Sequence, residues 1–410
     1  VAVIGLGYVG LELLLAIDKK KFSVNGFDNN IEKINLLNKK ISPINTITNT
    51  RIKKTKAKFL TKEKFSDLKK YDIIIICLPT PLRKNNEPDN SYLKECLNDI
   101  YPYLNKNQIL IIESTVYPGC TQEVFINKLK KKFIIGKDFF VSFSPERVSP
   151  AKKITLKYSE IVKLISGKSK KCLDISNLFY SKIFKKTHKC ESIEIAEFTK
   201  VYENAYRAIN ISFVNQMKMI CKKLNINIFD VINAARTKSF GFIPYLPSPG
   251  IGGHCIPIDP AFISYAAKKK NSNASIIDTA LEINQEVTKW VIKVITNKVK
   301  LNSNILILGM SYKKDVDDMR ESASIKIFSG LNKKHKVFFY DPYINEANVN
   351  GKLHHGIKNF NYKKLKEYDA IVLATDHNMF KYNLILKYSK IIFDTRTKYG
   401  NSKFKKVIHC

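Results

Sequence analysis

The sequence has no closely spaced cysteine pairs and no hydrophobic run long enough to cross a bilayer. Its eight cysteines lie singly along 410 residues, which argues against a zinc cage or a disulfide framework and favours a reducing compartment such as the cytoplasm. The longest apolar runs, such as residues 73–77, have the length of a strand, so neither a membrane span nor a signal peptide is expected. No set of His, Cys, Asp and Glu has the spacing of metal ligands, and no metal site is predicted.

Acidic residues are also scarce: the chain has 36 Asp and Glu but 70 Lys and Arg, so its formal net charge is +34. Such a charge could indicate a nucleic-acid-binding protein. The lysines are spread over the whole chain in short runs, at 19–21, 130–132 and 268–270, and no nucleic-acid-binding motif accompanies them. We therefore expect a composition bias on solvated faces and no nucleic-acid partner. The positive field would still help to recruit an anionic small substrate.

With 44% hydrophobic residues over this length, the chain is expected to form two or three domains. It opens on a short apolar strand that leads into GLGYVG at residues 5–10 and a helix over 11–17. Glycines in this pattern permit a tight turn, and the helix N-terminus offers N–H groups to a pyrophosphate. A second strand, 22–27, ends in Asp28, whose carboxylate can bind a ribose diol. No arginine follows to bind a 2′-phosphate, so NAD is favoured over NADP.

Three further apolar strands are expected at about 73–77, 108–112 and 139–143, and all have the composition of strands buried in a parallel sheet. Polar residues follow each of them: Thr80, Glu113, Ser114, Thr115, Glu146 and Arg147. Each one alone could be a cap or a turn residue. Because ligands bind at the carboxyl ends of strands in open α/β sheets, three strands that end in this way favour a binding site.

A long helix is predicted over 191–223, and a second one, which carries the only tryptophan, Trp290, over 276–300. Lys200 and Asn204 are four residues apart and share one face of the first helix. An ammonium and an amide on a buried face could stabilise an oxyanion or hold a water molecule. A solvated lysine is the alternative in so lysine-rich a chain.

The loop of residues 249–260, PGIGGHCIPIDP, frames Cys255 with glycines and prolines, and Asp259 follows four residues later. A thiol held in this way is a candidate nucleophile, and Asp259 is a candidate partner for water or a proton. The alternative is a buried structural cysteine. His254 is interpreted as structural, because adjacent side chains in an extended loop point apart.

The last segment repeats the design of the first, with strands expected near 304–309, 336–341 and 367–375 but without GxGxxG. Lys313 and Arg320 are cations that could bind phosphates or form surface ion pairs. The predicted fold is α/β, with two Rossmann-like doubly wound parallel-sheet domains joined by a helical connector. The predicted domains are an NAD-binding domain (1–190), a helical domain with the cysteine loop (191–300) and a second Rossmann-like domain (301–410).

Taken together, these motifs resemble the UDP-sugar 6-dehydrogenases. The resemblance runs in order through GLGYVGL, CLPTPL, ESTVYPG, SPER, GGHCIPIDP, MSYKKDVDDMRES, LATDH and FDTR, and covers nearly the whole chain. GGHCIPIDP and SPER resemble the N-acetylhexosamine branch, and residues 237–247 are most similar to the UDP-N-acetylglucosamine 6-dehydrogenases. The family implies an NAD-dependent four-electron oxidation of a sugar's 6-hydroxymethyl group, through a cysteine thiohemiacetal and thioester, which supplies uronic acids for bacterial surface polysaccharides.

The resemblance also implies roles for individual residues. Cys255 would be the nucleophile, Lys200 and Asn204 would stabilise charge on the reacting oxygen, and Asp259, Glu146 and Thr115 would assist with water and protons. Along NAD would lie Gly5, Gly7, Tyr8, Val9, Gly10, Asp28, Lys33, Thr80, Thr115 and Arg320. At the UDP-sugar would lie Glu146, Arg147, Lys200, Asn204, Tyr245, Gly252 and Lys313. Arg236 would reach a substrate bound to the neighbouring subunit of a homodimer.

Some positions depart from the family pattern. Glu12 stands where the family usually has proline, and residues 42–50 and 148–151 differ from the usual loops. The alternatives within the same chemistry are UDP-N-acetylmannosamine, UDP-N-acetylgalactosamine and UDP-glucose as substrates. A nucleotide-sugar sensor without activity, or a nucleic-acid-binding protein, is a more distant alternative.

Overall fold

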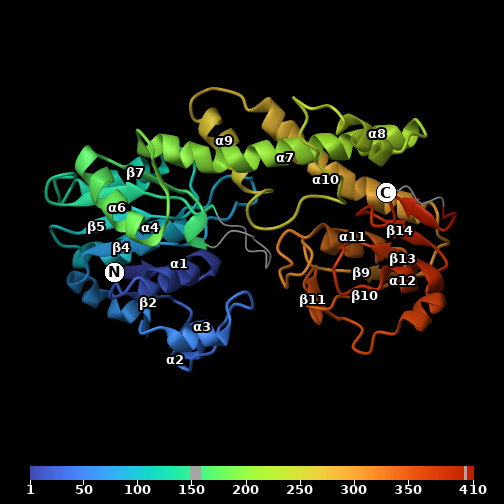
Figure 1. Ribbon diagram of the computed structural model, residues 1–410, viewed down its shortest axis with the longest axis horizontal. Helices are drawn as coiled ribbons and strands as arrows, with labels where there is room; N and C mark the ends of the chain where they lie inside the picture. Colours follow the sequence, from blue (N-terminus) through green and yellow to red (C-terminus); the bar gives the residue numbers. More distant parts are fainter. Residues whose placement is uncertain (148–157, 401–403) are drawn as a thin grey trace. The chain divides into compact units, whose positions relative to one another are not determined.

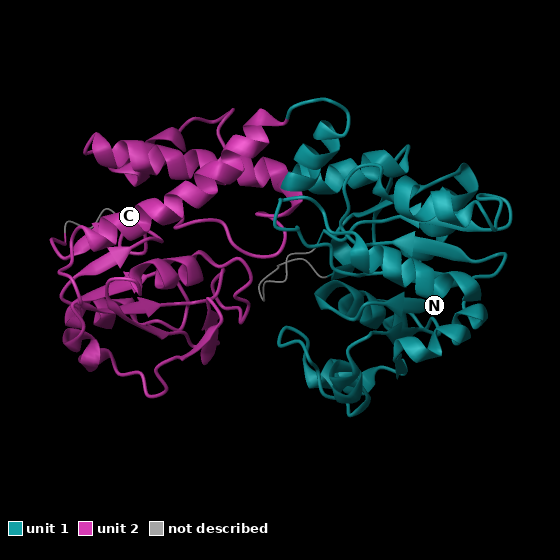
Figure 2. Ribbon diagram, turned by 180° about the vertical axis from the view of Figure 1, so that it is seen from behind, with its two compact units in different colours: residues 1–203, 261–273 teal, residues 204–260, 274–410 magenta. Residues whose placement is uncertain are grey.

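The computed structural model describes residues 1–147, 158–400 and 404–410, so residues 148–151 of the variant loop lie outside the described part. The chain forms two compact units, one of Val1–Glu203 with Ala261–Asn273 and one of Asn204–Pro260 with Ala274–Cys410 (Figure 2). Two helices, α7 (Ile193–Lys223) and α9 (Asp259–Lys268), run across the division. The three domains expected from the sequence stay a prediction, because compactness alone divides the chain into two.

The first unit is built on an eight-stranded sheet with the order β3-β2-β1-β4-β5-β6-β7-β8 (Figure 1). The strands are β1 (Ala2–Ile4), β2 (Asn25–Phe27), β3 (Phe59–Leu60), β4 (Ile73–Ile76), β5 (Ile109–Ile112), β6 (Phe140–Phe143), β7 (Lys163–Gly167) and β8 (Thr187–Lys189). All neighbours are parallel except β6 and β7. The order β3-β2-β1-β4-β5-β6 is that of a Rossmann sheet, which confirms the predicted fold class for this unit.

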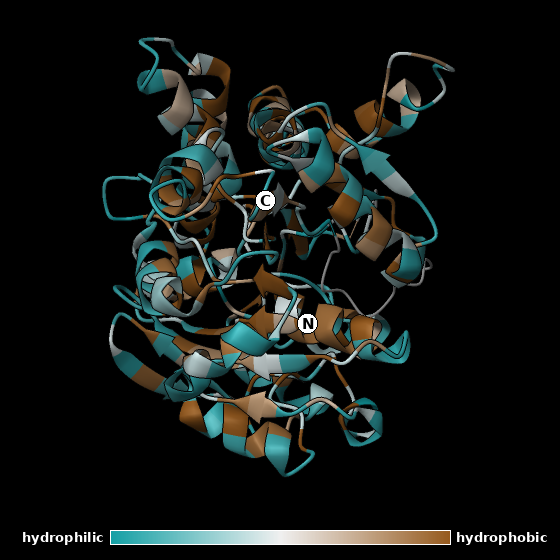
Figure 3. Ribbon diagram, turned by 90° about the vertical axis from the view of Figure 1, so that its left-hand side faces the viewer, coloured by the Kyte–Doolittle hydropathy of each residue, from teal (hydrophilic) through white to brown (hydrophobic). Residues whose placement is uncertain are grey.

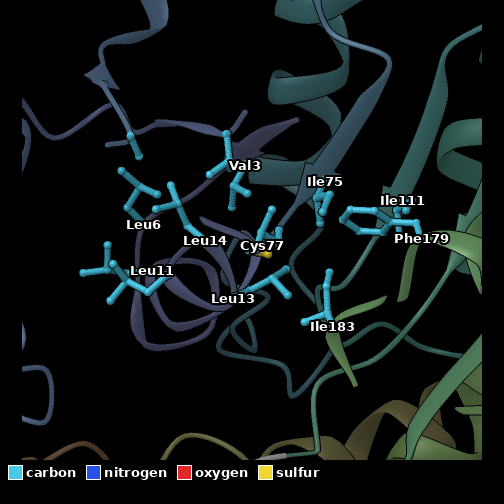
Figure 4. Close-up of a cluster of buried hydrophobic side chains, with 14 of the residues drawn as sticks. Val3, Leu6, Leu11, Leu13, Leu14, Ile75, Cys77, Ile111, Phe179 and Ile183 are labelled. Carbon is cyan, nitrogen blue, oxygen red and sulfur yellow. The ribbon is translucent and has the colours of Figure 1, made fainter. Parts of the chain in front are cut away.

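Continuous apolar runs explain why these segments lie inside a parallel sheet. All residues of β1 and β5 are buried, as strands covered by helices on both faces require. Leu6, Leu14 and Ile183 pack with strand residues into one core cluster (Figure 4). Burial of each such side chain contributes about 1.5–3 kcal/mol. Helices α1 (Tyr8–Lys19), α2 (Ile31–Asn38), α3 (Asn49–Lys54), α4 (Ser91–Ile100) and α6 (Lys170–Ile183) belong to this unit.

The departure at Glu12 has a local explanation. Its carboxylate forms a two-pronged ion pair with Arg51 of α3, with Nη–Oε distances of 2.8 and 2.7 Å. Arg51 follows the loop of residues 42–50, the other described departure. This ion pair therefore links Glu12 to the helix that follows the variant loop.

The second unit contains a five-stranded parallel sheet with the order β10-β9-β13-β14-β15. Its strands are β9 (Asn304–Leu308), β10 (Lys336–Tyr340), β13 (Ala370–Leu373), β14 (Ile392–Asp394) and β15 (Val407–His409). This sheet confirms the second Rossmann-like domain. A hairpin of β11 (Glu346–Val349) and β12 (Lys352–His355) turns at Asn350 and Gly351, both with positive φ. Asn-Gly suits such a turn, although the sequence interpretation did not include it.

Helices of the middle segment lead into this sheet. The predicted long helices are present as α7 and as α10 (Ser275–Thr296), and α8 (Ile228–Ala235) lies between them in the sequence. Helices α11 (Ala323–Leu331) and α12 (Tyr382–Tyr388) connect strands of the sheet itself. Colouring by hydropathy shows hydrophobic and hydrophilic stretches alternating along the helices, as expected of helices that cover a sheet with one face (Figure 3). Among the described residues, no helix is long and apolar enough to span a membrane.

Candidate functional site

The turn between β1 and α1 gives each of its three glycines a different surrounding. A side chain at Gly5 (φ +92°) would place Cβ 2.5 Å from the carbonyl oxygen of Cys77, and one at Gly10 would place it 1.9 Å from the carbonyl oxygen of Gly5. At Gly7 nothing lies within 4 Å of that position. Gly5 and Gly10 therefore permit the tight turn and the close packing of α1, whereas Gly7 leaves room for a ligand to approach the backbone.

The N-terminus of α1 lies directly behind this turn. Tyr8 and Val9 are its first residues, and its N-cap is Gly7, so no side chain at the N-cap position accepts a hydrogen bond from the first turn. Such a helix end, next to open space, suits a pyrophosphate. The residues present therefore fit the phosphates of a dinucleotide.

Asp28 ends β2 beside the same turn and is buried. Its Oδ2 accepts hydrogen bonds from Leu6 N (2.8 Å) and Lys33 Nζ (2.7 Å), and its Oδ1 accepts one from Asn30 N (2.9 Å). These three donors hold the carboxylate in one orientation. A carboxylate oxygen has further lone pairs, so Asp28 can still accept hydrogen bonds from a ribose diol.

Thr80 and Thr115 meet at the carboxyl ends of the neighbouring strands β4 and β5. Thr80 Oγ1 donates a hydrogen bond to the carbonyl oxygen of Thr115 at 2.6 Å, and Ser114 Oγ accepts one from Leu78 N at 2.8 Å. The glycine turn, Asp28 and Thr80 thus follow the neighbouring strands β1, β2 and β4 at the carboxyl edge of the sheet. Their predicted contacts with NAD stay a prediction.

Glu113 follows β5 but belongs to the core of the unit. Its carboxylate is paired with the buried Lys163 Nζ at 2.8 Å and accepts a hydrogen bond from the Tyr180 hydroxyl. Burial raises the pKa of Glu113, although the charge of Lys163 opposes this rise. Glu113 therefore has a structural role in the core. No local sequence pattern indicates its partners, Lys163 and Tyr180, which are 50 and 67 residues away.

Glu146 and Arg147 follow β6. The Glu146 carboxylate is buried and accepts hydrogen bonds from the Tyr158 hydroxyl and from Arg147 N, both at 2.7 Å. The Arg147 guanidinium is paired with Glu203 of α7 and donates to the carbonyl oxygen of Val162 at 3.0 Å. The predicted contact of Arg147 with substrate stays a prediction, and Glu203 is its partner in the described structure.

One face of α7 carries Glu197, Lys200 and Asn204 at successive turns. Glu197 accepts hydrogen bonds from Gly119 N (2.6 Å) and Thr121 N (2.8 Å), which ties α7 to the segment that follows Thr115. Burial raises the pKa of Glu197 to about 7, although these hydrogen bonds oppose the rise. Lys200 is only 9% exposed, so the solvated lysine that the sequence left open is not what the structure shows. Glu197 was not identified from the sequence.

Asn204 lies at the start of the second unit and contacts the thiol loop. Its Nδ2 donates a hydrogen bond to Asp259 Oδ2 at 2.6 Å, and both side chains are buried. The carbonyl oxygen of Cys255 accepts hydrogen bonds from the backbone N–H groups of Ile258 and Asp259, which closes a turn at the start of α9. Asn204 therefore contacts Asp259, and Cys255 lies one turn before Asp259 in the same loop. The predicted catalytic roles of the three residues stay predictions.

Cys255 differs from most other cysteines of the chain in its exposure. It is half-buried, as is Cys221, whereas the other six are buried. Burial raises the pKa of Cys96 and Cys410 to about 12, which makes these thiols poor nucleophiles. The Tyr312 ring packs directly on the loop, since a Cβ at Gly253 would lie 2.7 Å from it. Gly252 and Tyr312 are in similar contact.

Cations gather near Tyr312. Lys313 is half-buried, and its pKa is lowered by burial and then by the neighbouring charges of Arg207 and Lys314. Like charges held close together favour a ligand with several negative charges, such as a diphosphate. Arg207 was not identified from the sequence, although it lies three residues after Asn204 and thus near its face of α7.

Three more residues with predicted ligand contacts are Arg320, Arg236 and Tyr245. Arg320 is exposed and forms an ion pair with Asp318, with an Nη2–Oδ2 distance of 2.6 Å, which is the surface pairing considered from the sequence. Arg236 ends α8 and is exposed. The Tyr245 ring lies edge-on to Tyr206, with ring centroids 6.3 Å apart. Their predicted roles stay predictions.

A buried histidine fixes the segment that carries Tyr312 and Lys313. His377 Nδ1 accepts a hydrogen bond from Asp315 N at 2.9 Å, so its Nε2 carries the proton and donates to Asp341 Oδ2 at 3.0 Å. Burial alone would raise the pKa of Asp341, but hydrogen bonds from His377 and from backbone N–H groups hold it below its usual range. The LATDH motif therefore has a structural role that the sequence did not reveal.

Among the described residues, no group of three or more His, Cys, Asp and Glu side chains is arranged to hold a metal ion.

Comparison with known proteins gives three successive matches to the UDP-glucose/GDP-mannose dehydrogenase family. Its NAD binding domain matches residues 1–185, its central domain 194–286 and its UDP binding domain 306–401. Protein CapL of Staphylococcus aureus is 32% identical over 97% of this chain and 95% of its own length. A UDP-N-acetyl-D-glucosamine 6-dehydrogenase of Salmonella typhi is 32% identical over 93% of this chain and 90% of its own.

Solved structures agree with these sequence matches. The structure of a UDP-D-ManNAc dehydrogenase from Pyrococcus horikoshii superimposes with a TM-score of 0.83 at 29% identity, and the match covers 96% of this chain and 94% of that one.

Proposed function

Because the chain belongs to the UDP-glucose/GDP-mannose dehydrogenase family and uses NAD, we propose that it oxidises the 6-hydroxymethyl group of a UDP-N-acetylhexosamine to a carboxylate, with UDP-N-acetylglucosamine as the substrate. The uronic acid formed would serve the synthesis of a bacterial surface polysaccharide. The observation that carries the proposal is the half-buried Cys255, whose backbone carbonyl accepts a hydrogen bond from Asp259 N, while the Asp259 side chain accepts one from Asn204. The chain that carries this loop matches all three parts of the family.

The proposed reaction removes two hydrides from one carbon, and NAD held at the glycine turn and Asp28 would supply the hydride acceptor for each oxidation. The first oxidation yields an aldehyde. The Cys255 thiolate adds to the aldehyde carbon, and the carbonyl oxygen takes up a proton to give a thiohemiacetal. Loss of the second hydride from the carbon and of the proton from its hydroxyl group would convert this adduct into a thioester. Water would then add to the thioester carbon, and the carbon–sulfur bond would break to leave the carboxylate, a proton and the Cys255 thiol. Cys255 thus keeps the reactive aldehyde attached to the protein between the two steps.

The other residues of the proposed site handle charge and protons. Lys200 and Asn204 would donate to the oxygen of the reacting carbon, on which negative charge develops. Asp259, oriented by its hydrogen bond from Asn204, would direct water and accept protons, together with Glu146 and Thr115. Lys313, whose pKa is lowered by burial and by the charge of Arg207, would bind the diphosphate.

The sugar itself is tested by measuring NADH release from the purified protein with UDP-N-acetylglucosamine, UDP-N-acetylmannosamine, UDP-N-acetylgalactosamine and UDP-glucose. We expect the highest kcat/KM with UDP-N-acetylglucosamine and two NADH for each sugar consumed. UDP-N-acetylmannosamine is the second candidate, because the Pyrococcus horikoshii structure is that of a UDP-D-ManNAc dehydrogenase. No NADH release with any of the four sugars, together with salt-sensitive retention of nucleic acid, would favour the binding-protein alternative.

We also propose that the protein is a homodimer that pairs through α7. Tyr206, Phe213 and Ile220 are seven residues apart on this helix, so they lie along one face, and all three are exposed in the single chain. Exposed apolar side chains in such a row suit a second copy of the same helix. In such a dimer Arg236 of one copy would reach the substrate of the other, as the family resemblance implies.

Phe213→Glu tests the dimer, because it places a charge on a side chain that is 57% exposed in the single chain and would be buried in the dimer. We expect light scattering to show a monomer with an intact circular dichroism spectrum. Leu301→Glu is the matched control, since Leu301 is also an exposed apolar residue (70%) but lies outside α7. A dimer that survives Phe213→Glu would exclude this face as the interface.

A further inference from the structure

The segment before Cys255, residues 248–253, is largely buried although it belongs to no helix or strand. Buried backbone N–H and C=O groups must be hydrogen-bonded, and a segment outside regular structure must find its partners elsewhere. We call these six residues the anchor segment. Its partners are side chains of α7 and α10, together with one backbone carbonyl, and all of them lie in the second unit.

Helix α7 binds the beginning of the anchor segment. Asn215 Oδ1 accepts a hydrogen bond from Ser248 N at 2.7 Å, and Lys218 Nζ donates one to the carbonyl oxygen of Ser248 at 3.1 Å. Lys218 is buried with its ammonium 5.3 Å from the Trp290 ring, and burial lowers its pKa to about 8. Both backbone groups of Ser248 are thus satisfied by side chains one turn apart on α7.

Helix α10 binds the middle of the anchor segment. Thr288 Oγ1 donates a hydrogen bond to the carbonyl oxygen of Pro249 at 2.8 Å. Asn284, one turn earlier, accepts a hydrogen bond from Ile251 N at 2.5 Å and donates one to the carbonyl oxygen of Ile251 at 3.3 Å. Its amide therefore binds both backbone groups of one residue, as a neighbouring strand would.

Two glycines separate Ile251 from His254 and Cys255, and glycine gives the chain the greatest conformational freedom. The thiol can keep one position only if both sides of this flexible link are fixed. Within the link, Gly253 N donates a hydrogen bond to the carbonyl oxygen of Arg320 at 2.9 Å, and on the far side the carbonyl oxygen of Cys255 accepts one from Asp259 N at 2.8 Å. On the near side, Ile251 directly precedes the link, and the side chain of Asn284 holds its backbone by two hydrogen bonds.

We propose that Asn284, supported by Thr288, is a positioning residue that sets where the Cys255 thiol stands relative to the sugar carbon. The assignment rests on the proposed function, in which Cys255 is the nucleophile. Asn284 touches neither substrate nor cofactor in this role. It acts through Ile251 and the glycine link, and reaction rates respond steeply to such placement, with a displacement of about 1 Å costing on the order of a hundredfold.

The test compares Asn284→Ala, Asn284→Asp and Thr288→Val with Gln285→Ala. Gln285 is the matched control, since it is an exposed amide one residue further along α10. Asn284→Ala should lower kcat about a hundredfold and change KM for NAD less than about threefold. Asn284→Asp keeps the acceptor for Ile251 N and should recover about tenfold of that loss, and Thr288→Val should lower kcat about tenfold. Gln285→Ala should resemble the wild type.

A second readout follows the thiol itself. The rate of alkylation of Cys255 by iodoacetamide, measured by mass spectrometry on the protein without substrate, should change in Asn284→Ala and return toward the wild-type rate in Asn284→Asp. If the wild type oxidised no UDP-sugar, the proposed function would be refuted. The alkylation rate would still be measurable, so the effect of Asn284 on the Cys255 thiol could be tested separately. An Asn284→Ala variant with unchanged kcat and alkylation rate would overturn the proposal. So would a loss of NAD affinity that matches the loss of kcat in all three variants, because it would reveal a general structural role.

Discussion

Replacing Cys255 by alanine should abolish formation of the uronic acid while NAD still binds. The aldehyde from the first oxidation would have no thiol to add to, so the second hydride could not leave from a covalent adduct. Loss of a nucleophile typically costs a thousandfold or more, and we expect at least about that loss in acid formation. The measurement is the ratio of NADH formed to sugar consumed, together with mass spectrometry of the sugar product.

Cys221→Ala is the matched control for this variant. Cys221 is the other half-buried cysteine and lies near the end of α7, so its loss removes a thiol of comparable exposure without touching the loop. It should keep the two-to-one ratio and nearly the wild-type rate. Full turnover by Cys255→Ala, with NAD binding measured by calorimetry, would remove Cys255 from the mechanism and the main support from the proposed function.

The sequence predicted most strands of the two sheets because buried parallel strands have a distinctive composition. β4 consists of four consecutive isoleucines, and β9 and β13 are nearly as apolar, so each could be located from its hydrophobic run. β7 escaped prediction because it begins with Lys163, whose charge is neutralised by a partner 50 residues away. Pairings over such distances leave no local pattern in the sequence.

Some residues of the candidate site could be identified from local sequence patterns, and others could not. Cys255, Asn204 and Asp259 could be chosen because glycine-rich framing and helical spacing are local properties. The residues that hold the loop could not, because Asn284 is 33 residues from Ile251 and Asn215 is 33 residues from Ser248. Glu197 was missed for the same reason, since its two donors lie more than 70 residues earlier in the chain. Local chemistry is visible in a sequence, whereas the groups that position it become visible only in the fold.

Lys200→Met should lower kcat by about a hundred- to thousandfold and leave KM for NAD nearly unchanged. In the proposed mechanism the ammonium stabilises negative charge on the oxygen of the reacting carbon, and loss of one such donor typically has an effect of this size. Methionine keeps the length and the apolar stem of lysine, so the change removes mainly the charge. The measurement is steady-state kinetics with the preferred UDP-sugar, with Lys223→Met, an exposed lysine at the end of the same helix, as the control.

For Lys200→Met we expect stability to change in the opposite direction from activity, or not at all. A lysine that is only 9% exposed has lost most of its hydration, and a buried ammonium costs free energy that a thioether does not. Lys200→Met should therefore unfold at the same denaturant concentration as the wild type or at a higher one, while its activity falls. A residue retained for packing alone would lose stability and activity together. An unchanged kcat would show that Lys200 takes no part in the reaction, and a large loss of stability would show that its burial serves the fold.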